Sequence, residues 1–507
     1  MQKQKNPDPF IRSEPIFIYA KIELFFNKTK FFGTNSRRIP NLTFARNMIQ
    51  LCLSHYRYFT AMLWIAAMTY TLLLAVCTVR IAGAGHSPAA AWAWLLAVWT
   101  VPAVGMAIYM LAAWHPAPQA GRYGGGTSFL ESVIAGGCGV TATGGNSVAL
   151  LNDGGQMFPS LIREMQRARR SIHLEYYIFS DDRIGTAIAD LLCRKVRAGV
   201  EVRFMYDAVG SWRPSAATVR KLRSAGAEVR AFGQLRFPWL TPSLNIRNHR
   251  KIAVIDGRTA FIGGINIARR YLDGDELGRW RDEHLRLEGP AAAALQRLFA
   301  EDWCAAGGKP FDTESRIATC GGTAAGARVQ ICRSQTGRTR RAIADAFMAA
   351  IMQARHDIMI STPYFVPPQP LLRALCIAAA GGVRVRLMVP SRADMRVAAL
   401  AGETYFGELL EAGADIYLYD NGFLHSKTVV VDSRIASVGT ANMDCRSLCT
   451  NWEVAAFIYD ESFARMASAT FEQDALCCRR LTLREHEARP LRRRIAANIC
   501  RLFSDLL

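Results

Sequence analysis

His249-Arg-Lys-Ile-Ala-Val-Ile-Asp256 and His425-Ser-Lys-Thr-Val-Val-Val-Asp432 are two copies of one pattern, H-x-K-x-x-x-x-D. In a strand, side chains two residues apart lie on the same face, so each copy presents a histidine and a lysine together. The apolar, largely β-branched run that follows is typical of a buried strand, which the aspartate ends. A single match could arise by chance, whereas two copies predict one active site built from two halves of the chain.

Each copy continues into a second short apolar run, and these runs lead to Asn266 and Asn442. Gly264 allows close approach of the backbone, and Thr440 stands at the matching place in the second copy. The two asparagine amides can donate to an anionic oxygen beside the lysine ammonium. Together these segments predict a cradle for a phosphate group.

Two histidines, two lysines and two asparagines suit a tetrahedral anion better than a carbonyl group. A cation about 4 Å from developing negative charge contributes roughly 4 kcal/mol at an intermediate dielectric. We expect no metal, because the interleaved lysines would repel a divalent cation and no carboxylate cluster lies at ligand spacing.

A longer internal repeat surrounds the two motifs, and strands alternate in it with helical stretches such as 186–195 and 371–380. The parallel segments are 171–179 with 357–365, 198–205 with 381–388, and the stretches from Ser224 and Glu411. This alternation predicts an α/β fold of two lobes, each a mixed sheet covered by helices, related by a pseudo-twofold axis through the catalytic cleft.

The 507-residue chain has room for these two lobes and a membrane attachment. The expected segments are a basic N-terminal stretch at 1–58, a transmembrane hairpin with helices at 59–79 and 89–114, a first lobe at 131–307, a linker at 308–327, a second lobe at 328–475 and a basic amphipathic tail at 476–507.

The two apolar runs have 21 and 26 uncharged residues, interrupted only by Pro102, and about 20 apolar residues span a bilayer. The alternative is a pair of buried helices in a soluble domain. Ten Lys and Arg precede Phe59 and one lies in the turn at 80–88, which places both ends of the hairpin in the cytoplasm. If Met48 is the real start, one of those ten charges remains, and the charge argument weakens.

The paired motifs resemble those of the phospholipase D superfamily, and further phrases are similar to its bacterial cardiolipin synthase branch. These phrases are Glu175-Tyr-Tyr-Ile-Phe179, Tyr206-Asp-Ala-Val-Gly-Ser211, Trp280-Arg-Asp-Glu-His284, Thr362-Pro-Tyr-Phe-Val-Pro367 and Phe423-Leu-His-Ser-Lys427. The resemblance runs from about Val140 to the C-terminus.

The resemblance implies a multi-pass enzyme of the bacterial inner membrane, with its catalytic lobes in the cytoplasm, that converts two phosphatidylglycerol molecules into cardiolipin and glycerol. His249 would form a phosphohistidine and His425 would act as acid and then base, although the near-symmetric motifs leave the choice of nucleophile open. No cofactor is implied, because one phosphodiester replaces another.

The resemblance also assigns roles to four acids. Asp282 and Glu453, 33 and 28 residues after the histidines of their own repeats, match positions that orient and polarise an imidazole. The alternative for these two is a surface pairing with arginine. Asp256 and Asp432, within the motifs, are expected to be more structural than chemical, bonding backbone or lysine at their strand ends.

The formal net charge of +20 indicates an anionic partner. The apolar runs favour acidic phospholipid over nucleic acid, which we do not expect to bind; the oligomeric state is not predicted. Seven arginines between 479 and 494 precede an apolar stretch that forms either an interfacial helix or a tail packed on the catalytic domain.

Two other functions stay open. A hydrolytic phospholipase D or nuclease would use the same histidines with water as the acceptor. A non-enzymatic lipid-binding scaffold would keep the fold, but it would have no need for both intact motifs.

Overall fold

The computed structural model describes residues 41–83, 88–112, 126–211, 216–233, 246–314, 326–335, 339 and 341–504. Most of the predicted basic segment 1–58 and more than half of the predicted linker 308–327 lie outside the described residues. The chain divides into two compact units, one ending at Val76 and one beginning at Cys77, and we describe each by itself.

The first apolar run lies in one continuous helix, α2 (Asn41–Gly83). Its segment Gln50–Gly83 contains an 18-residue window with a mean hydropathy of 2.0 and is long and apolar enough to cross a membrane. Residues such as Trp64 and Met68 are exposed by 73% and 70%, so this segment does not belong to a protein core within the described structure.

The predicted transmembrane hairpin is wrong in its second helix, because the apolar run 89–114 does not form one span. It divides into α3 (Pro88–Thr100) and α4 (Pro102–Ala112). Pro102 has no backbone N–H and disfavours helical geometry at the preceding residue, so the helix breaks there. The two short helices fold back on each other: a Cβ on Gly105 would lie 2.2 Å from the carbonyl oxygen of Ala97. At about 1.5 Å per residue, neither reaches across a hydrocarbon core of about 30 Å.

The main body of the chain, formed by the described residues between 126 and 504, is built on one mixed sheet of 15 strands, whose order is β19-β13-β12-β10-β15-β16-β18-β9-β1-β8-β6-β5-β2-β3-β4. The strands are β1 (Thr143–Leu151), β2 (Ser171–Tyr176), β3 (Glu201–Asp207), β4 (Glu228–Phe232), β5 (Lys251–Ile255), β6 (Thr259–Gly263), β8 (His284–Glu288), β9 (Ala327–Ser334), β10 (Asp357–Ser361), β12 (Arg384–Pro390), β13 (Asp415–Tyr419), β15 (Thr428–Val431), β16 (Ile435–Gly439), β18 (Glu453–Ile458) and β19 (Cys478–Leu481).

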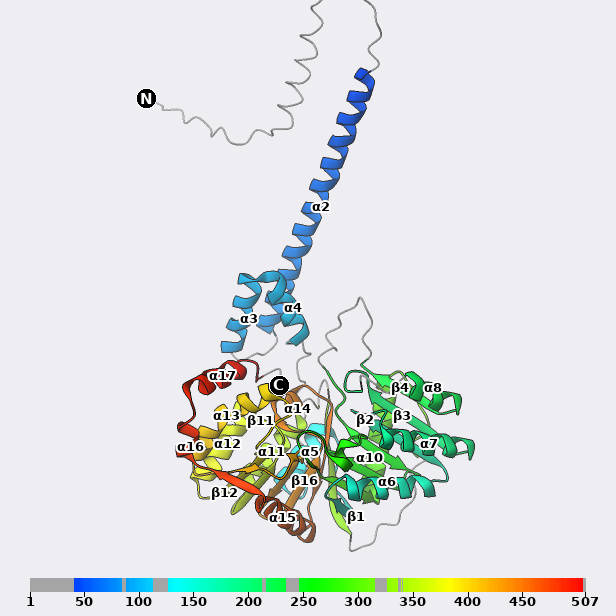
Figure 1. The fold of residues 1–507 in the computed structure, drawn as a ribbon, viewed down its shortest axis with the longest axis vertical. Coiled ribbons are helices and arrows are strands. Elements are labelled where there is room, and N and C mark those ends of the chain that lie inside the picture. The colour runs from blue at the N-terminus through cyan, green and yellow to red at the C-terminus, as the bar shows by residue number, and fades with distance from the viewer. Residues whose placement is uncertain are drawn as a thin grey trace, which may run out of the picture. The chain divides into compact units, whose positions relative to one another are not determined.

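The strand order displays the internal repeat. Read outward from the central antiparallel pair β1 and β9, both halves follow the same connectivity, with β8, β6, β5, β2, β3 and β4 matched by β18, β16, β15, β10, β12 and β13. Among these matched strands the outer three of each half are parallel, and the inner strands pair antiparallel. Figure 1 shows the first repeat in cyan and green beside the second in yellow to red. The predicted α/β fold of two repeats is confirmed.

Helices cover both faces of this sheet. They are α6 (Gly154–Arg167), α7 (Arg183–Arg197) and α8 (Ala216–Ser224) in the first repeat, α11 (Ala342–Gln353), α12 (Gln369–Ala380) and α13 (Arg396–Glu411) in the second, and α10 (Pro290–Ala305) and α15 (Glu461–Ala475) on the opposite face. The stretches 186–195 and 371–380 are helical, as predicted. The core below α10 and α15 takes side chains from both repeats, including Val254 and Val430, so the two halves share one interior.

Helix α5 (Phe129–Cys138) differs from the predicted division, which placed residues from 131 onward in the first lobe. Leu130 and Ile134 are fully buried in the core of the second repeat, together with Ile343 and Phe347 of α11. A helix that precedes the first repeat in the sequence therefore packs on the second repeat.

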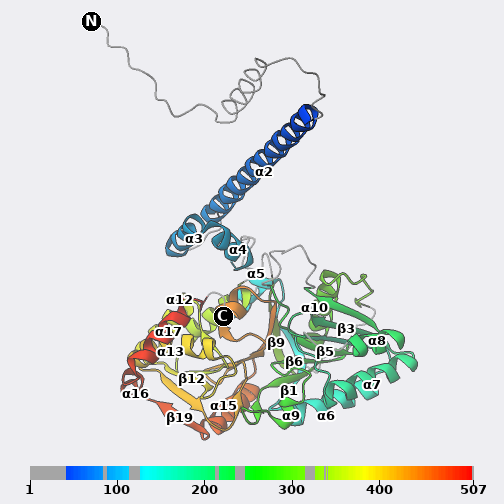
Figure 2. The same cartoon turned by 45° about the horizontal axis from the view of Figure 1, so that its top comes forward.

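The C-terminal tail packs on the second repeat, which is one of the two predicted alternatives. Strand β19 extends the sheet beside β13. After α16 (Leu483–Glu487), α17 (Leu491–Arg501) lies against α13 (Figures 1 and 2), where Arg493 pairs with Glu403 at 2.6 Å.

Candidate active site

The two predicted histidines line one cavity of about 400 Å³, together with Asn266 and Asn442. Each histidine lies just before a buried strand, His249 before β5 and His425 before β15. Strand β5 runs antiparallel to β2, and β15 runs antiparallel to β10. The sheet thus brings residues far apart in the sequence to one place.

The segment that carries each histidine pairs with the other repeat. The backbone N–H of His249 donates to the carbonyl of Trp452 at 2.9 Å, and that of His425 donates to Arg281 at 2.7 Å. A short parallel pair, β7 (Trp280–Arg281) with β14 (Phe423–Leu424), reinforces the second crossing. Each histidine is therefore adjacent to the residue that precedes the acid of the opposite half.

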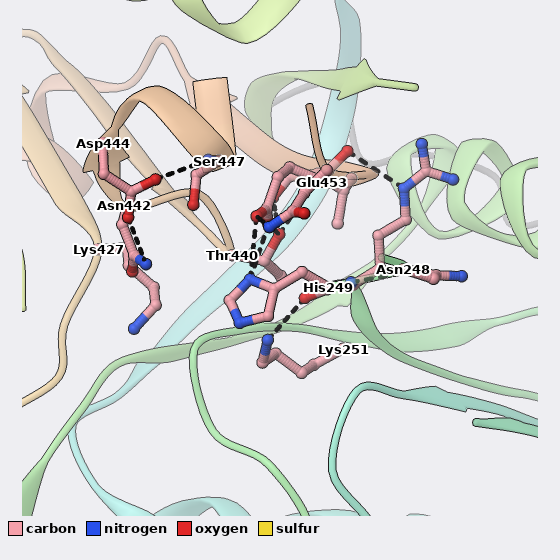
Figure 3. Close-up of polar contacts among 12 residues, drawn as sticks. Asn248, His249, Lys251, Lys427, Thr440, Asn442, Asp444, Ser447 and Glu453 are labelled. Carbon is pink, nitrogen blue, oxygen red and sulfur yellow. Dashed lines mark hydrogen bonds and ion pairs between the residues drawn. The ribbon is translucent and has the colours of Figure 1, made fainter. Parts of the chain in front are cut away.

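The orienting acids are exchanged between the repeats. Nδ1 of His249 lies 3.0 Å from Oε1 of Glu453, and Nδ1 of His425 lies 2.6 Å from Oδ2 of Asp282. An N–H donated from Nδ1 to a carboxylate leaves Nε2 of each ring with a lone pair. Sequence spacing associated each acid with the histidine of its own repeat, whereas the structure joins it to the other one. Figure 3 shows His249 directed toward Glu453.

Gly264 and Thr440 hold these two acids in different ways. A Cβ on Gly264 would lie 2.1 Å from Oδ1 of Asp282, so only glycine leaves space for this carboxylate. Thr440 donates its hydroxyl to Oε2 of Glu453 at 2.5 Å. The hydroxyl of Thr440 therefore fixes the acid and is not directed at a phosphate.

The two motif lysines are buried near one another. Nζ of Lys251 donates to the carbonyl of His249 at 2.6 Å, and Lys427 makes the same bond to His425. Burial lowers the pKa of Lys251 to about 7, with Glu453 opposing this shift and Lys427 adding to it. Burial also lowers the pKa of Lys427 to about 8, against the attraction of Asp282. An anion in the cavity would raise both pKa values, because it favours the charged ammonium.

The surroundings of both imidazoles lower their pKa and favour the neutral ring. Burial lowers the pKa of His249, and Glu453 opposes the shift. Burial and then the charges of Lys427 and Lys251 hold the pKa of His425 well below its usual value. A neutral ring with a free Nε2 is the form required of a nucleophile or a base.

The two acids respond differently to the same kind of site. Burial raises the pKa of Asp282 to about 6, although Lys427 and the N–H of Glu283 stabilise its charge. Burial would raise the pKa of Glu453 as well, but His249, Lys251 and Thr440 outweigh it and the pKa falls. Asp282 is consequently more easily protonated than Glu453.

The two asparagines are partly occupied by neighbouring groups. Oδ1 of Asn266 accepts from the N–H of Ile178, and its amide donates to the hydroxyl of Tyr271 at 2.8 Å. The amide of Asn442 donates to Asp444 at 3.0 Å (Figure 3). Each side-chain NH₂ has a second hydrogen, so one donor of each remains for a ligand.

Asp256 and Asp432 lie at the far ends of β5 and β15 from the lysines. The carboxylate of Asp256 accepts the N–H groups of residues 169–171, and that of Asp432 accepts those of residues 355–357. Both residues have φ of 52°, in the left-handed region of a tight turn. The structure does not bring these two members of the motif into the cavity.

Aromatic side chains complete the lining, and sequence reasoning assigned them no role. Tyr177 packs edge-on against His249 with centroids 4.7 Å apart, and Trp280 lies 5.2 Å from His425. Tyr271 and Tyr364 also line the cavity. Tyr177, Trp280 and Tyr364 occur in the phrases that carried the family resemblance, which was the one available signal.

A cavity lined by one histidine from each repeat, with a buried lysine and an exchanged acid in contact with each histidine residue, defines the phospholipase D-like class of phosphoryl-transfer proteins. The family model described as "Cardiolipin synthase, PLD-like domain" matches residues 161–303 and 347–475. The chain belongs to this cardiolipin synthase family.

Curated relatives share a large part of the chain. It is 42% identical over 364 residues to the cardiolipin synthase of Geobacillus kaustophilus (strain HTA426), covering 71% of this chain and 72% of the relative. It is 36% identical over 453 residues to the major cardiolipin synthase ClsA of Bacillus subtilis (strain 168), covering 82% and 94%.

Among solved structures, the phosphatidylserine synthase of Haemophilus influenzae Rd KW20 matches with a TM-score of 0.54. The match covers 71% of this chain and 95% of that protein at 16% sequence identity. At this identity the likeness shows a common fold alone.

Proposed function

We propose that the chain transfers a phosphatidyl group from one phosphatidylglycerol molecule to another and releases cardiolipin and glycerol. The observation that carries the proposal is the crossed pair of histidine and acid contacts inside one cavity, with two lysines beside them. Membership of the cardiolipin synthase family supports this choice of substrate.

In the first step Nε2 of His249 attacks phosphorus, and the bond from phosphorus to the oxygen of the headgroup glycerol breaks. Negative charge on the bound phosphate raises the pKa of His425, so this ring becomes an imidazolium that gives its proton to the leaving oxygen. Lys251, Lys427 and the two asparagine amides stabilise charge on the non-bridging oxygens.

In the second step a glycerol hydroxyl of another phosphatidylglycerol attacks the phosphohistidine. His425 takes the hydroxyl proton as the new P–O bond forms, and the P–N bond to His249 breaks. One phosphodiester has replaced another, and both histidines are restored without any nucleotide.

The test uses purified full-length protein in detergent with phosphatidylglycerol that is labelled in its headgroup glycerol and in its acyl chains. Labelled cardiolipin with free glycerol supports the proposal, whereas phosphatidic acid alone identifies a hydrolase and overturns it. His249→Ala and His425→Ala should each abolish turnover. His356→Ala, at an exposed position outside the cavity, is the matched control and should leave turnover unchanged.

The same proposal places α2 in the cytoplasmic membrane and the catalytic body in the cytoplasm. Ten basic residues before Phe59 support a cytoplasmic N-terminus. Because neither α3 nor α4 is long enough to cross alone, a single crossing by α2 would put the N-terminus and the catalytic body on opposite sides of the membrane. A cytoplasmic N-terminus and a cytoplasmic catalytic body together therefore require a second crossing. Fusion of a periplasmic reporter enzyme to the C-terminus tests this: reporter activity would contradict a cytoplasmic catalytic body.

A further inference from the structure

Helix α17 has one face that is fixed to the catalytic body. Ala497 is 1% exposed, and Arg493 pairs with Glu403 of α13 at 2.6 Å. Past the helix, Ser504 accepts a hydrogen bond of 2.9 Å from the hydroxyl of Tyr405, also on α13. These contacts hold the helix in one orientation.

The opposite face of α17 carries an apolar stripe. Leu491, Ile495, Ile499 and Leu502 are exposed by 70%, 51%, 54% and 82%. Their spacing of four, four and three residues places them along one side of a helix, over about 17 Å at 1.5 Å per residue. A soluble surface rarely presents such a row, which usually marks a contact with a partner or a membrane.

The charge beside the stripe selects the kind of partner. Helix α17 contains four arginines and no acidic residue. Arg492 and Arg494 are exposed next to the stripe, while Arg493 and Arg501 lie toward α13. An apolar row bordered by arginine is complementary to acyl chains below anionic headgroups.

The stripe is also tied to the cavity through α13. The cavity is lined by Ala398 of α13 and by Met395, which immediately precedes this helix. Met395 and Val397 are exposed by 49% and 46%. The helix that holds α17 thus begins at the active site and adds apolar side chains there.

We propose that the α17 stripe, defined as Leu491, Ile495, Ile499 and Leu502, binds the surface of an anionic phospholipid leaflet and holds the catalytic cavity against it. The apolar helix α2 supplies attachment, whereas α17 sets which face of the catalytic body meets the lipid. Headgroups can then enter the cavity while their acyl chains stay in the leaflet.

The first test is photocrosslinking in the full-length protein, reconstituted in nanodiscs that contain phosphatidylglycerol. A photoreactive phenylalanine analogue replaces Ile499, or in the control Met466, which is 45% exposed on α15 at the opposite face of the sheet. We expect a lipid adduct at 499, at least tenfold more abundant than at 466. Crosslinks from 499 to a second copy or to another segment of the chain, or equal lipid adducts at both positions, would overturn the proposal.

The second test is kinetic and rests on the proposed function. In mixed micelles of long-chain phosphatidylglycerol, Ile495→Glu/Ile499→Glu should raise the interfacial KM about tenfold, the equivalent of about 1.4 kcal/mol, with little change in kcat. With dispersed short-chain substrate the same variant should match the unmodified protein. Equal losses with both substrates would contradict an interfacial role. A chain that makes no cardiolipin would refute the proposed function and leave the crosslinking test intact.

Discussion

Gly264 and Thr440 occupy equivalent places in the two repeats but position their acids by different means. Glycine leaves a space that the Asp282 carboxylate enters, and threonine donates a hydrogen bond to Glu453. The pKa values of the two acids also differ: burial raises that of Asp282 to about 6, whereas His249 above all lowers that of Glu453, with a smaller contribution from Thr440. The two pairs of acid and histidine therefore have different electrostatic surroundings although their motifs are nearly symmetric.

Gly264→Ala should disable the His425 side of the site. The new Cβ would lie 2.1 Å from Oδ1 of Asp282 and displace this carboxylate from the ring. Loss of a carboxylate that orients a catalytic histidine costs about 10²- to 10⁴-fold in kcat. Steady-state kinetics with phosphatidylglycerol measure the effect. Gly144→Ala is the control, because its Cβ would meet nothing within 4 Å, and equal activity of the two variants would contradict the assignment.

The hairpins β5–β6 and β15–β16 are the elements that hold the motif in place. Asp256 and Asp432 each fix the turn of one hairpin to the start of the neighbouring antiparallel strand, β2 or β10, by accepting three backbone N–H groups. The spacing between lysine and aspartate, which is the same in both repeats, thus reflects the length of a strand with the histidine and lysine at one end and a structural aspartate at the other.

Asp256→Ala should destabilise the fold without removing catalysis. Three hydrogen bonds to a carboxylate are lost and alanine is strained at a φ of 52°, so we expect a loss of about 2–4 kcal/mol. Asp256→Asn keeps one acceptor oxygen and tolerates this φ, so its loss should be smaller. Denaturant unfolding gives the free energies. A kcat reduced by orders of magnitude in folded Asp256→Asn would instead make this residue part of the chemistry.

Elements with strong local signals were predictable from the sequence. The strands after each motif, the helices near 186–195 and 371–380, and the two-repeat fold follow from periodicity and repetition. The second apolar run was not, because Pro102 permits either a kinked span or two packed helices, and close packing at Gly105 decides between them. The exchange of Asp282 and Glu453 was also beyond reach, because it depends on pairing between segments of different repeats and not on spacing within one.

At the scale of the whole molecule, the site exists because both repeats belong to one sheet with a shared core. The two lysines come from different repeats but act on the same buried group: the charges of Lys427 and Lys251 both lower the pKa of His425. An anion that binds between them therefore interacts with both repeats at once and favours their joined arrangement.

Binding of inorganic phosphate at pH 8 should be accompanied by proton uptake. Burial lowers the pKa of Lys251 to about 7 and that of Lys427 to about 8, so part of the ammonium charge is missing in the empty cavity and returns when the anion binds. Affinity should fall as pH rises from 7 to 9. Calorimetry in two buffers of different ionisation enthalpy measures the uptake, and identical heats in both would contradict it.

The stability of the folded chain without an anion depends on pH in the opposite direction from phosphate affinity. Both lysines bind protons more weakly in the folded state than in the unfolded state, where their pKa is about 10.4. Their contribution to stability therefore rises with pH between about 7 and 10.4 and falls as the solution is acidified through that range. Lys251→Met should reduce both this slope and the proton uptake.

The exchanged acids make each repeat dependent on its neighbour. A polypeptide holding just one copy would possess an imidazole with no carboxylate to steer it and a carboxylate with no imidazole to serve. Only a symmetrical pair of such chains, docked edge to edge along the central strand, would restore both partnerships. Duplication within a single gene product makes that docking permanent, and it frees the two copies to specialise, one toward attack and the other toward proton delivery.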